Sequence, residues 1–257
     1  MNITIASNNQ LKNWKKLQMG KYRKKSGLFL AEGIRCVEQI LENGNIDVEE
    51  LIIQKGWNPD QLAVNKNLSF YELESSDFES VSDTDNPQGI IAVCKIPKES
   101  RVEDLNKKSG VILATDAIQD PGNLGTIIRT ASWFGVAGML FGTGTVDSFH
   151  PKVIRSTAGA TGILPFLTGN LNELLSSFEE QNWNTFLLDA GEGSKNLNEI
   201  DPPDKSILVI GNEGNGISGE LFEKSRHRIK IEGNPNHVES LNAAMACSIA
   251  LYEFAKR

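Results

Sequence analysis

Short apolar runs alternate with helical segments in the second half of the chain, and this alternation constrains the fold more than any other feature. The runs contain no charged residue and lie at residues 111–114, 138–141, 185–188 and 207–210. Continuous apolar runs are typical of strands in a parallel sheet that helices cover on both faces. Residues 124–134 and 171–181 have the spacing of the intervening helices. The pattern predicts an α/β fold that binds ligands beyond the carboxyl ends of its strands, after residues 115, 188 and 210.

The first 97 residues show a second alternation, with shorter elements. We expect strands at residues 27–33, 50–53, 69–73 and 88–94, and helices at 10–24, 34–41, 60–65 and 75–81. Such a series predicts a small α/β domain. The composition changes at residues 96–101, where Pro, Lys, Glu and Ser gather. We therefore predict a domain at 1–97, a linker at 98–106 and a second domain at 107–257.

Composition excludes several classes of protein. None of the apolar runs approaches the roughly 20 residues of a membrane helix, and no signal-like apolar segment opens the chain. The three cysteines are far apart in apolar settings, which favours reduced thiols over disulfides. Only three histidines occur, and none pairs with a cysteine. We expect a cytoplasmic protein without membrane contact and without a metal.

Positive charge gathers at the N-terminus of a chain whose net charge is −7. The first 31 residues contain no acidic residue, and Lys21, Arg23, Lys24 and Lys25 crowd one short segment. A local basic patch on an acidic chain is typical of an RNA-binding surface. A solvated basic helix face is the alternative that charge alone leaves open.

Two glycine-rich turns follow apolar runs, but neither matches a nucleotide-binding loop. In residues 141–147, Asp147 stands where a dinucleotide fingerprint has its third glycine. Residues 211–218 lack the lysine that precedes Ser or Thr in a phosphate-binding loop. A dinucleotide-dependent oxidoreductase is therefore an alternative with little support.

Residues 120–131, with the sequence DPGNLGTIIRTA, form a more specific pattern. Ile127 and Ala131 share one face of the expected helix, and Arg129 falls on roughly the opposite face. Asn123 lies in the turn that opens the helix. Spacing alone is also compatible with Asn123 as a helix cap and Arg129 as a surface charge.

Three stretches together resemble the motifs of the SpoU/TrmH family of RNA ribose 2′-O-methyltransferases, which belong to the SPOUT class. They are DPGNLGTIIRTA at 120–131, GNEGNGIS at 211–218 and SLNAAMA at 240–246, in the family's order. The first 95 residues also resemble the substrate-binding domain that often precedes the catalytic one, at KYRKKSG (21–27) and AEG (31–33). A non-catalytic RNA-binding module that keeps the fold is the remaining alternative.

The resemblance implies a fold and partners that periodicity does not show. It implies an N-terminal L30e-like RNA-binding domain and a C-terminal domain with a deep trefoil knot, although true knots are rare. It also implies S-adenosylmethionine (AdoMet) held in the knot loops, and a homodimer whose active site lies near the interface. The helix from Ser240 is apolar nearly all round, which fits either a subunit interface or simple core burial.

The resemblance also implies the site residues. Arg129 is expected to act on the ribose hydroxyl, with Asn123, Glu213, Ser240 and Asn242 around it. Because a guanidinium stays protonated, we expect Arg129 to stabilise the developing alkoxide instead of accepting its proton. Glu213 is either a catalytic group or a structural carboxylate. The residues expected to hold the methyl donor are Gly211, Ile231 and Leu241, and ordinary core packing is the alternative for each. The residues expected to bind RNA are Lys21, Arg23, Lys24 and Lys25.

One position departs from the family pattern, and the substrate stays open. Ala244 stands where the third motif commonly has a further serine, which bears on packing at the start of the helix. The extra N-terminal domain favours a structured RNA as substrate. We expect ribosomal RNA, most specifically 23S ribosomal RNA, ahead of transfer RNA.

Overall fold

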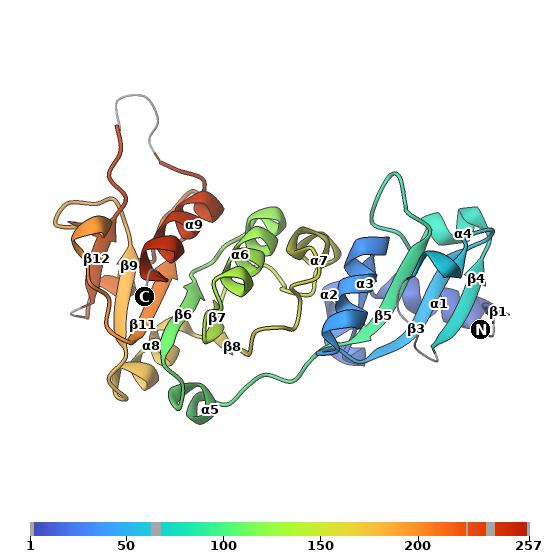
Figure 1. Cartoon of the computed structure of the whole chain (residues 1–257), viewed down its shortest axis with the longest axis horizontal. Coiled ribbons are helices and arrows are strands. Elements are labelled where there is room, and N and C mark those ends of the chain that lie inside the picture. Colours follow the sequence, from blue (N-terminus) through green and yellow to red (C-terminus); the bar gives the residue numbers. More distant parts are fainter. Residues whose placement is uncertain (1–2, 63–67, 225, 235–239, 256–257) are drawn as a thin grey trace. The chain divides into compact units, whose positions relative to one another are not determined.

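The structure is a computed structural model and describes residues 3–62, 68–224, 226–234 and 240–255 (Figure 1). Its contacts divide the chain into two compact units. The first unit comprises Met1–Lys98 and Asp147–Ile163, and the second comprises Glu99–Val146 and Leu164–Arg257. This division differs from the expected continuous domain at 107–257, because residues 147–163 pack within the first unit.

The first unit contains a mixed five-stranded sheet. The strand order is β1 (Ile3–Ile5), β4 (Ser69–Leu73), β3 (Val48–Gln54), β5 (Ile90–Lys95) and β2 (Leu28–Glu32). β5 runs antiparallel to both of its neighbours, whereas β1, β4 and β3 are parallel. Its helices are α1 (Asn8–Lys16), α2 (Gly20–Ser26), α3 (Ile34–Asn43), α4 (Ser75–Glu79) and α7 (Pro151–Thr157). β1, which was not expected from the sequence, is a short edge strand of exposed residues.

The single helix expected at residues 10–24 is wrong, because the chain breaks between α1 and α2. Met19 has an extended backbone, and Leu17 turns into the core. The Nη1 atom of Arg23 donates to the carbonyl oxygens of Leu17 and Gln18, both at 2.8 Å. These side-chain bonds replace the backbone bonds that a continuous helix makes, and so they stabilise the break. The helix expected at 60–65 is a 3₁₀ turn at Pro59–Gln61, and residues 63–67 lie outside the described residues.

The second unit contains a seven-stranded sheet whose recorded pairings are all parallel, which confirms the predicted fold class. The order is β10 (Lys195–Asn196), β12 (His227–Lys230), β9 (Asn184–Leu188), β11 (Lys205–Ile210), β6 (Gly110–Thr115), β7 (Gly138–Gly142) and β8 (Phe166–Gly169). β8 lies at the edge of the sheet and begins at Phe166, directly after Pro165, which is a position where proline is tolerated.

Two pairs of helices cover this sheet (Figure 1). α5 (Val102–Asn106) and α8 (Leu171–Glu179) share a core with alternate residues of the central strands. α6 (Pro121–Trp133) and α9 (Ala243–Phe254) pack against each other, and Phe254 of α9 contacts Phe186 on the opposite face of β9 from the α8 core. Short 3₁₀ turns occur at Leu197–Glu199 and Gly219–Phe222. α5 lies inside the segment expected to be a linker, because Leu105 anchors it in the core.

Candidate functional site

The carboxyl ends of four parallel strands meet at one edge of the second sheet. β6 leads into Asp116, β11 into Gly211, β9 into Asp189 and β12 into Ile231. Asp189 forms an ion pair with Arg228 of β12, at 2.5 Å between Oδ2 and Nη2. The loops after β6 and β11, on adjacent strands, carry the first two sequence motifs. This edge is where an open parallel sheet binds ligands.

The loop after β11 is closed by its own hydrogen bonds. Oδ1 of Asn212 accepts the backbone N–H groups of Gly214 and Asn215 at 2.9 Å, and its Nδ2 donates to the Ala117 carbonyl at 2.7 Å. The loop folds back so tightly that a Cβ atom at Gly211 would lie 2.5 Å from the Gly216 carbonyl carbon. Glycine at 211 is therefore required by the loop itself. Asn212 was not among the expected site residues, although asparagine two residues before a glycine is a signal for such a turn.

The side chain of Asn123 is free to act in the site because another residue caps α6. Oδ1 of Asp120 accepts the Asn123 backbone N–H at 2.8 Å, and Pro121 occupies the first helical position. This arrangement is a typical helix N-terminus. The proposed capping role for Asn123 is thus filled by Asp120.

A chain of side-chain hydrogen bonds joins all three motifs. Nδ2 of Asn123 donates to Oε1 of Glu213 at 2.8 Å, and Nδ2 of Asn242 donates to Oδ1 of Asn123 at 2.9 Å. The other carboxylate oxygen of Glu213 accepts the Gln119 backbone N–H at 3.4 Å. We call Glu213, Asn123 and Asn242 the polar chain. Its members come from segments 90 and 119 residues apart, so only the tertiary fold brings them together.

Asn242 also begins α9. Its Oδ1 accepts the backbone N–H groups of Ala244 at 2.9 Å and Met245 at 3.3 Å. The helix therefore starts at Ala243, three residues later than expected, and the amide group of Asn242 is held in one orientation. Ala244 is 2 % exposed, so the residue that departs from the family pattern lies in the core.

Arg129 is exposed on α6, and within the described residues its guanidinium has no hydrogen bond or ion pair. Glu213 is therefore bonded to Asn123 and not to the arginine. Ser240 is exposed before α9, Leu241 is 50 % exposed, and Ile231 is half-buried. The guanidinium and these side chains are available to ligands.

An apolar surface lies beside Arg129. Met245, Ile249 and Tyr252 recur at helical spacing on α9 and are 55 %, 42 % and 56 % exposed. Trp133 of α6 is 85 % exposed. We call these four residues the α9 face. The opposite side of α9 packs in the core, which is one of the two roles expected of its apolar composition. The exposed α9 face is where the other role, a subunit interface, would lie.

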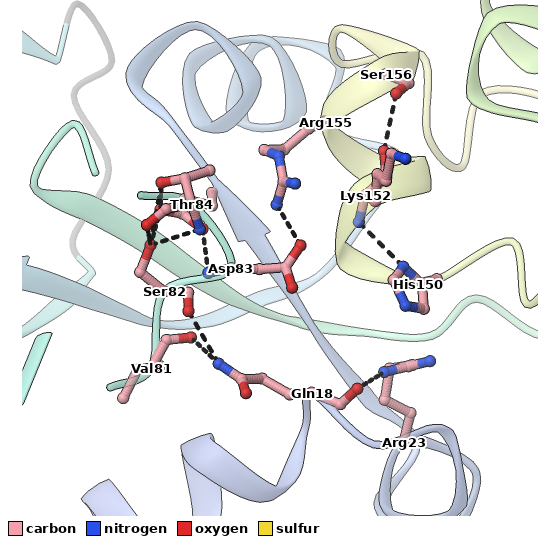
Figure 2. Close-up of polar contacts among 11 residues, drawn as sticks. Gln18, Arg23, Val81, Ser82, Asp83, Thr84, His150, Lys152, Arg155 and Ser156 are labelled. Carbon is pink, nitrogen blue, oxygen red and sulfur yellow. Dashed lines mark hydrogen bonds and ion pairs between the residues drawn. The ribbon is translucent and has the colours of Figure 1, made fainter. Parts of the chain in front are cut away.

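The four predicted RNA-binding residues have different surroundings. Lys21, Lys24 and Lys25 are exposed on α2. Arg23 is only 2 % exposed, and its Nη2 atom forms an ion pair with Oδ2 of Asp147 at 2.6 Å. Its bond to the Gln18 carbonyl appears in Figure 2. The expectation for Arg23 is corrected, because a buried and fully paired guanidinium does not reach a phosphate.

Neither of two further kinds of site is found in the part of the chain that the structure describes. No group of three or more His, Cys, Asp or Glu side chains is placed to hold a metal ion there. None of its helices is long and apolar enough to span a membrane.

Two family models match the chain. The SpoU rRNA Methylase family matches residues 110–252, which is more than half of the chain, and the MRM3-like substrate binding domain matches residues 8–92. The first match contains the three motifs and the polar chain. The second contains α2 with its exposed lysines.

Individual proteins resemble the chain over nearly its full length. The 23S rRNA (guanosine(2553)-2′-O)-methyltransferase RlmP of Bacillus subtilis is 34 % identical over 97 % of both chains. An uncharacterized tRNA/rRNA methyltransferase of Mycolicibacterium gilvum is 27 % identical over 93 % of this chain and 79 % of its own. Among solved structures, an AdoMet-bound rRNA methyltransferase from Sinorhizobium meliloti is 26 % identical, with a TM-score of 0.85 over 100 % of this chain and 97 % of that one.

Proposed function

Since the chain belongs to the SpoU rRNA methylase family, we propose that this methyltransferase carries a methyl group from AdoMet to a ribose 2′-hydroxyl of structured RNA. The polar chain carries the proposal, because it unites three motifs at the edge where a parallel sheet binds ligands. We place 23S ribosomal RNA ahead of transfer RNA as the substrate. The B. subtilis relative is named for 23S rRNA, and the substrate-binding domain supports a structured RNA.

The residues at the sheet edge suit AdoMet. Leu241 and Ile231 offer partly exposed apolar side chains to an adenine, and the tight loop after Gly211 offers backbone groups. When bound, AdoMet supplies a methyl group that its sulfonium charge has already activated. The remaining task for the protein is to align the ribose oxygen with that methyl group and to stabilise the charge that develops on the oxygen.

The polar residues divide this task. Arg129 is a guanidinium donor that pairs with no described residue, so its role is to bind the developing alkoxide and a neighbouring phosphate. Asn123 is held from both sides by Glu213 and Asn242, and it orients the sugar. Glu213 acts by holding Asn123, and Ser240 adds an exposed hydroxyl to the same edge.

Assembly and location follow from the same proposal. The α9 face is an exposed apolar surface next to Arg129, which supports a homodimer formed through the C-terminal helix. The trefoil knot implied by the family and a cytoplasmic location, where ribosomal RNA is modified, belong to the proposal as well.

The test uses RNA from a strain that lacks this protein. The purified full-length protein is incubated with that RNA and tritiated AdoMet, and the label is mapped after alkaline hydrolysis, which leaves the bond next to a 2′-O-methyl ribose intact. We expect label in one 23S nucleotide. If the RNA from that strain lacks the modification and still receives no label, the proposal is contradicted. That result would favour a non-catalytic binding module.

A further inference from the structure

α7 lies within the stretch that matches the methylase family, yet it packs as part of the first unit. It contacts β2, and Phe149 just before it packs against Phe29 in a tilted arrangement, with ring centroids 5.1 Å apart. After the helix, the carbonyl of Gly159 accepts a bond from Nδ2 of Asn43 at 3.2 Å. α2 contacts β2 as well, so the two helices share one supporting strand.

Two arginines hold α7 in place and neutralise the nearby carboxylates. Arg23 of α2 pairs with Asp147 just before α7. Arg155 of α7 pairs with Asp83 at 2.7 Å (Figure 2). Asp83 is itself held by Glu32, whose Oε2 accepts the Asp83 backbone N–H at 2.9 Å. Both carboxylates next to the helix are therefore satisfied within the protein.

On α2 and α7, the cations that form no ion pair with a described residue are lysines. Lys152 on α7 is exposed, like Lys21, Lys24 and Lys25 on α2, and none of the four forms an ion pair with a described residue. Lys55 and Lys95, elsewhere in the first unit, each pair with a glutamate. Burial and then the charge of Arg23 lower the pKa of His150 below its ordinary value of 6.5, which disfavours its charged form.

We propose that Lys152 of α7 and Lys21, Lys24 and Lys25 of α2 form one phosphate-binding face for the RNA substrate. Arg23 and Arg155 are positioning residues that build this face without touching the RNA. The argument is charge complementarity: unpaired lysines release counterions on meeting phosphates, whereas internally paired groups do not. This inference rests on the proposed function and adds to it a segment that lies outside the substrate-binding match at 8–92.

The experiment measures binding of the full-length protein to 23S ribosomal RNA over a series of salt concentrations. We expect Lys152→Ala to bind several-fold more weakly at low salt. Its slope of log affinity against log salt should fall by roughly 0.7–0.9, the loss of one phosphate contact. The control is Lys55→Ala, which removes an exposed but paired lysine and should bind as the wild type does.

A second variant separates the positioning residues from the lysines. We expect Asp147→Asn to lower the thermal midpoint and to leave the salt slope unchanged, because Arg23 stays buried. A slope for Lys152→Ala equal to that of the wild type would overturn the inference. The proposed function is tested separately, by measuring methyl transfer from the wild-type protein to the same RNA. The two proposals can therefore fail independently.

Discussion

Asn242 performs two tasks with the two ends of one amide group. Its oxygen caps α9, and its nitrogen donates to Asn123. Asn212 also uses both ends of its amide group. Its oxygen accepts a hydrogen bond within the turn, and its nitrogen donates to the Ala117 carbonyl in the loop after β6. At both positions an asparagine provides an acceptor and a donor that no carboxylate provides together.

Two substitutions of Asn242 separate its tasks. Asn242→Asp keeps a good cap but loses the donor, so we expect near wild-type stability and a large loss of methyl transfer. Asn242→Ala loses both, and we expect a further cost of about 1 kcal/mol in the free energy of unfolding. Denaturant titration and labelled-methyl transfer measure the two effects. Full activity in the aspartate variant would show that the bond to Asn123 is not used.

Arg129→Ala tests the separation of donor loops from the hydroxyl site. Removing a charge stabiliser of the transition state costs about 10²–10³ in rate, so we expect at least that loss of methyl transfer. Binding of AdoMet, followed by calorimetry, should change little, because the expected donor residues lie after β11 and β12. Arg101→Ala, which removes an exposed arginine paired with Asp104, is the matched control. Loss of AdoMet binding in Arg129→Ala would refute this separation.

At the scale of elements, ion pairs fasten helices to strands within a unit. Arg226, before β12, pairs with Glu179 of α8 at 2.7 Å, and the arginine side chain is only 2 % exposed. Burial alone would raise the pKa of Glu179, but hydrogen bonds from Arg226 and Thr185 and the charge of Arg226 outweigh it. The pKa of Glu179 is therefore below its ordinary value of 4.5.

This shift gives a pH dependence with a definite sign. A carboxyl group with a lowered folded-state pKa stabilises the fold above its unfolded pKa, and this contribution is lost as pH falls through the folded value. We expect Glu179→Gln to cost roughly 1–3 kcal/mol at neutral pH, because Arg226 loses a charged partner. The difference from the wild type should shrink below about pH 4. Urea titrations at both pH values measure it, and a difference that is constant with pH would contradict the assignment.

At the scale of the whole molecule, the α9 face is the surface that we propose forms the homodimer. We expect Ile249→Asp to turn the homodimer into monomers, because a charge within a buried apolar interface is strongly unfavourable. Sedimentation equilibrium measures the mass. Ile5→Asp is the control, because Ile5 is 83 % exposed on β1 of the other unit. A protein that is already monomeric as wild type would contradict the proposed dimer.

The sequence was sufficient for the central strands of the second unit because their apolar runs are continuous. Residues 111–114, 185–188 and 207–210 became β6, β9 and β11 with changes only at their ends. Short elements were missed where burial is small or local signals conflict. β1 has only exposed residues, and α5 was hidden in a segment with the composition of a linker.

The three motifs, their order and the identity of the exposed Arg129 were determined by the sequence alone, because these depend on residue type and spacing. The tertiary structure decided which side chains meet. It joined Glu213, Asn123 and Asn242 across segments far apart in the chain, buried Arg23 against Asp147, and packed α7 with the first unit. Such contacts depend on how strands and helices pack in three dimensions, and local patterns of residues contain no information about them.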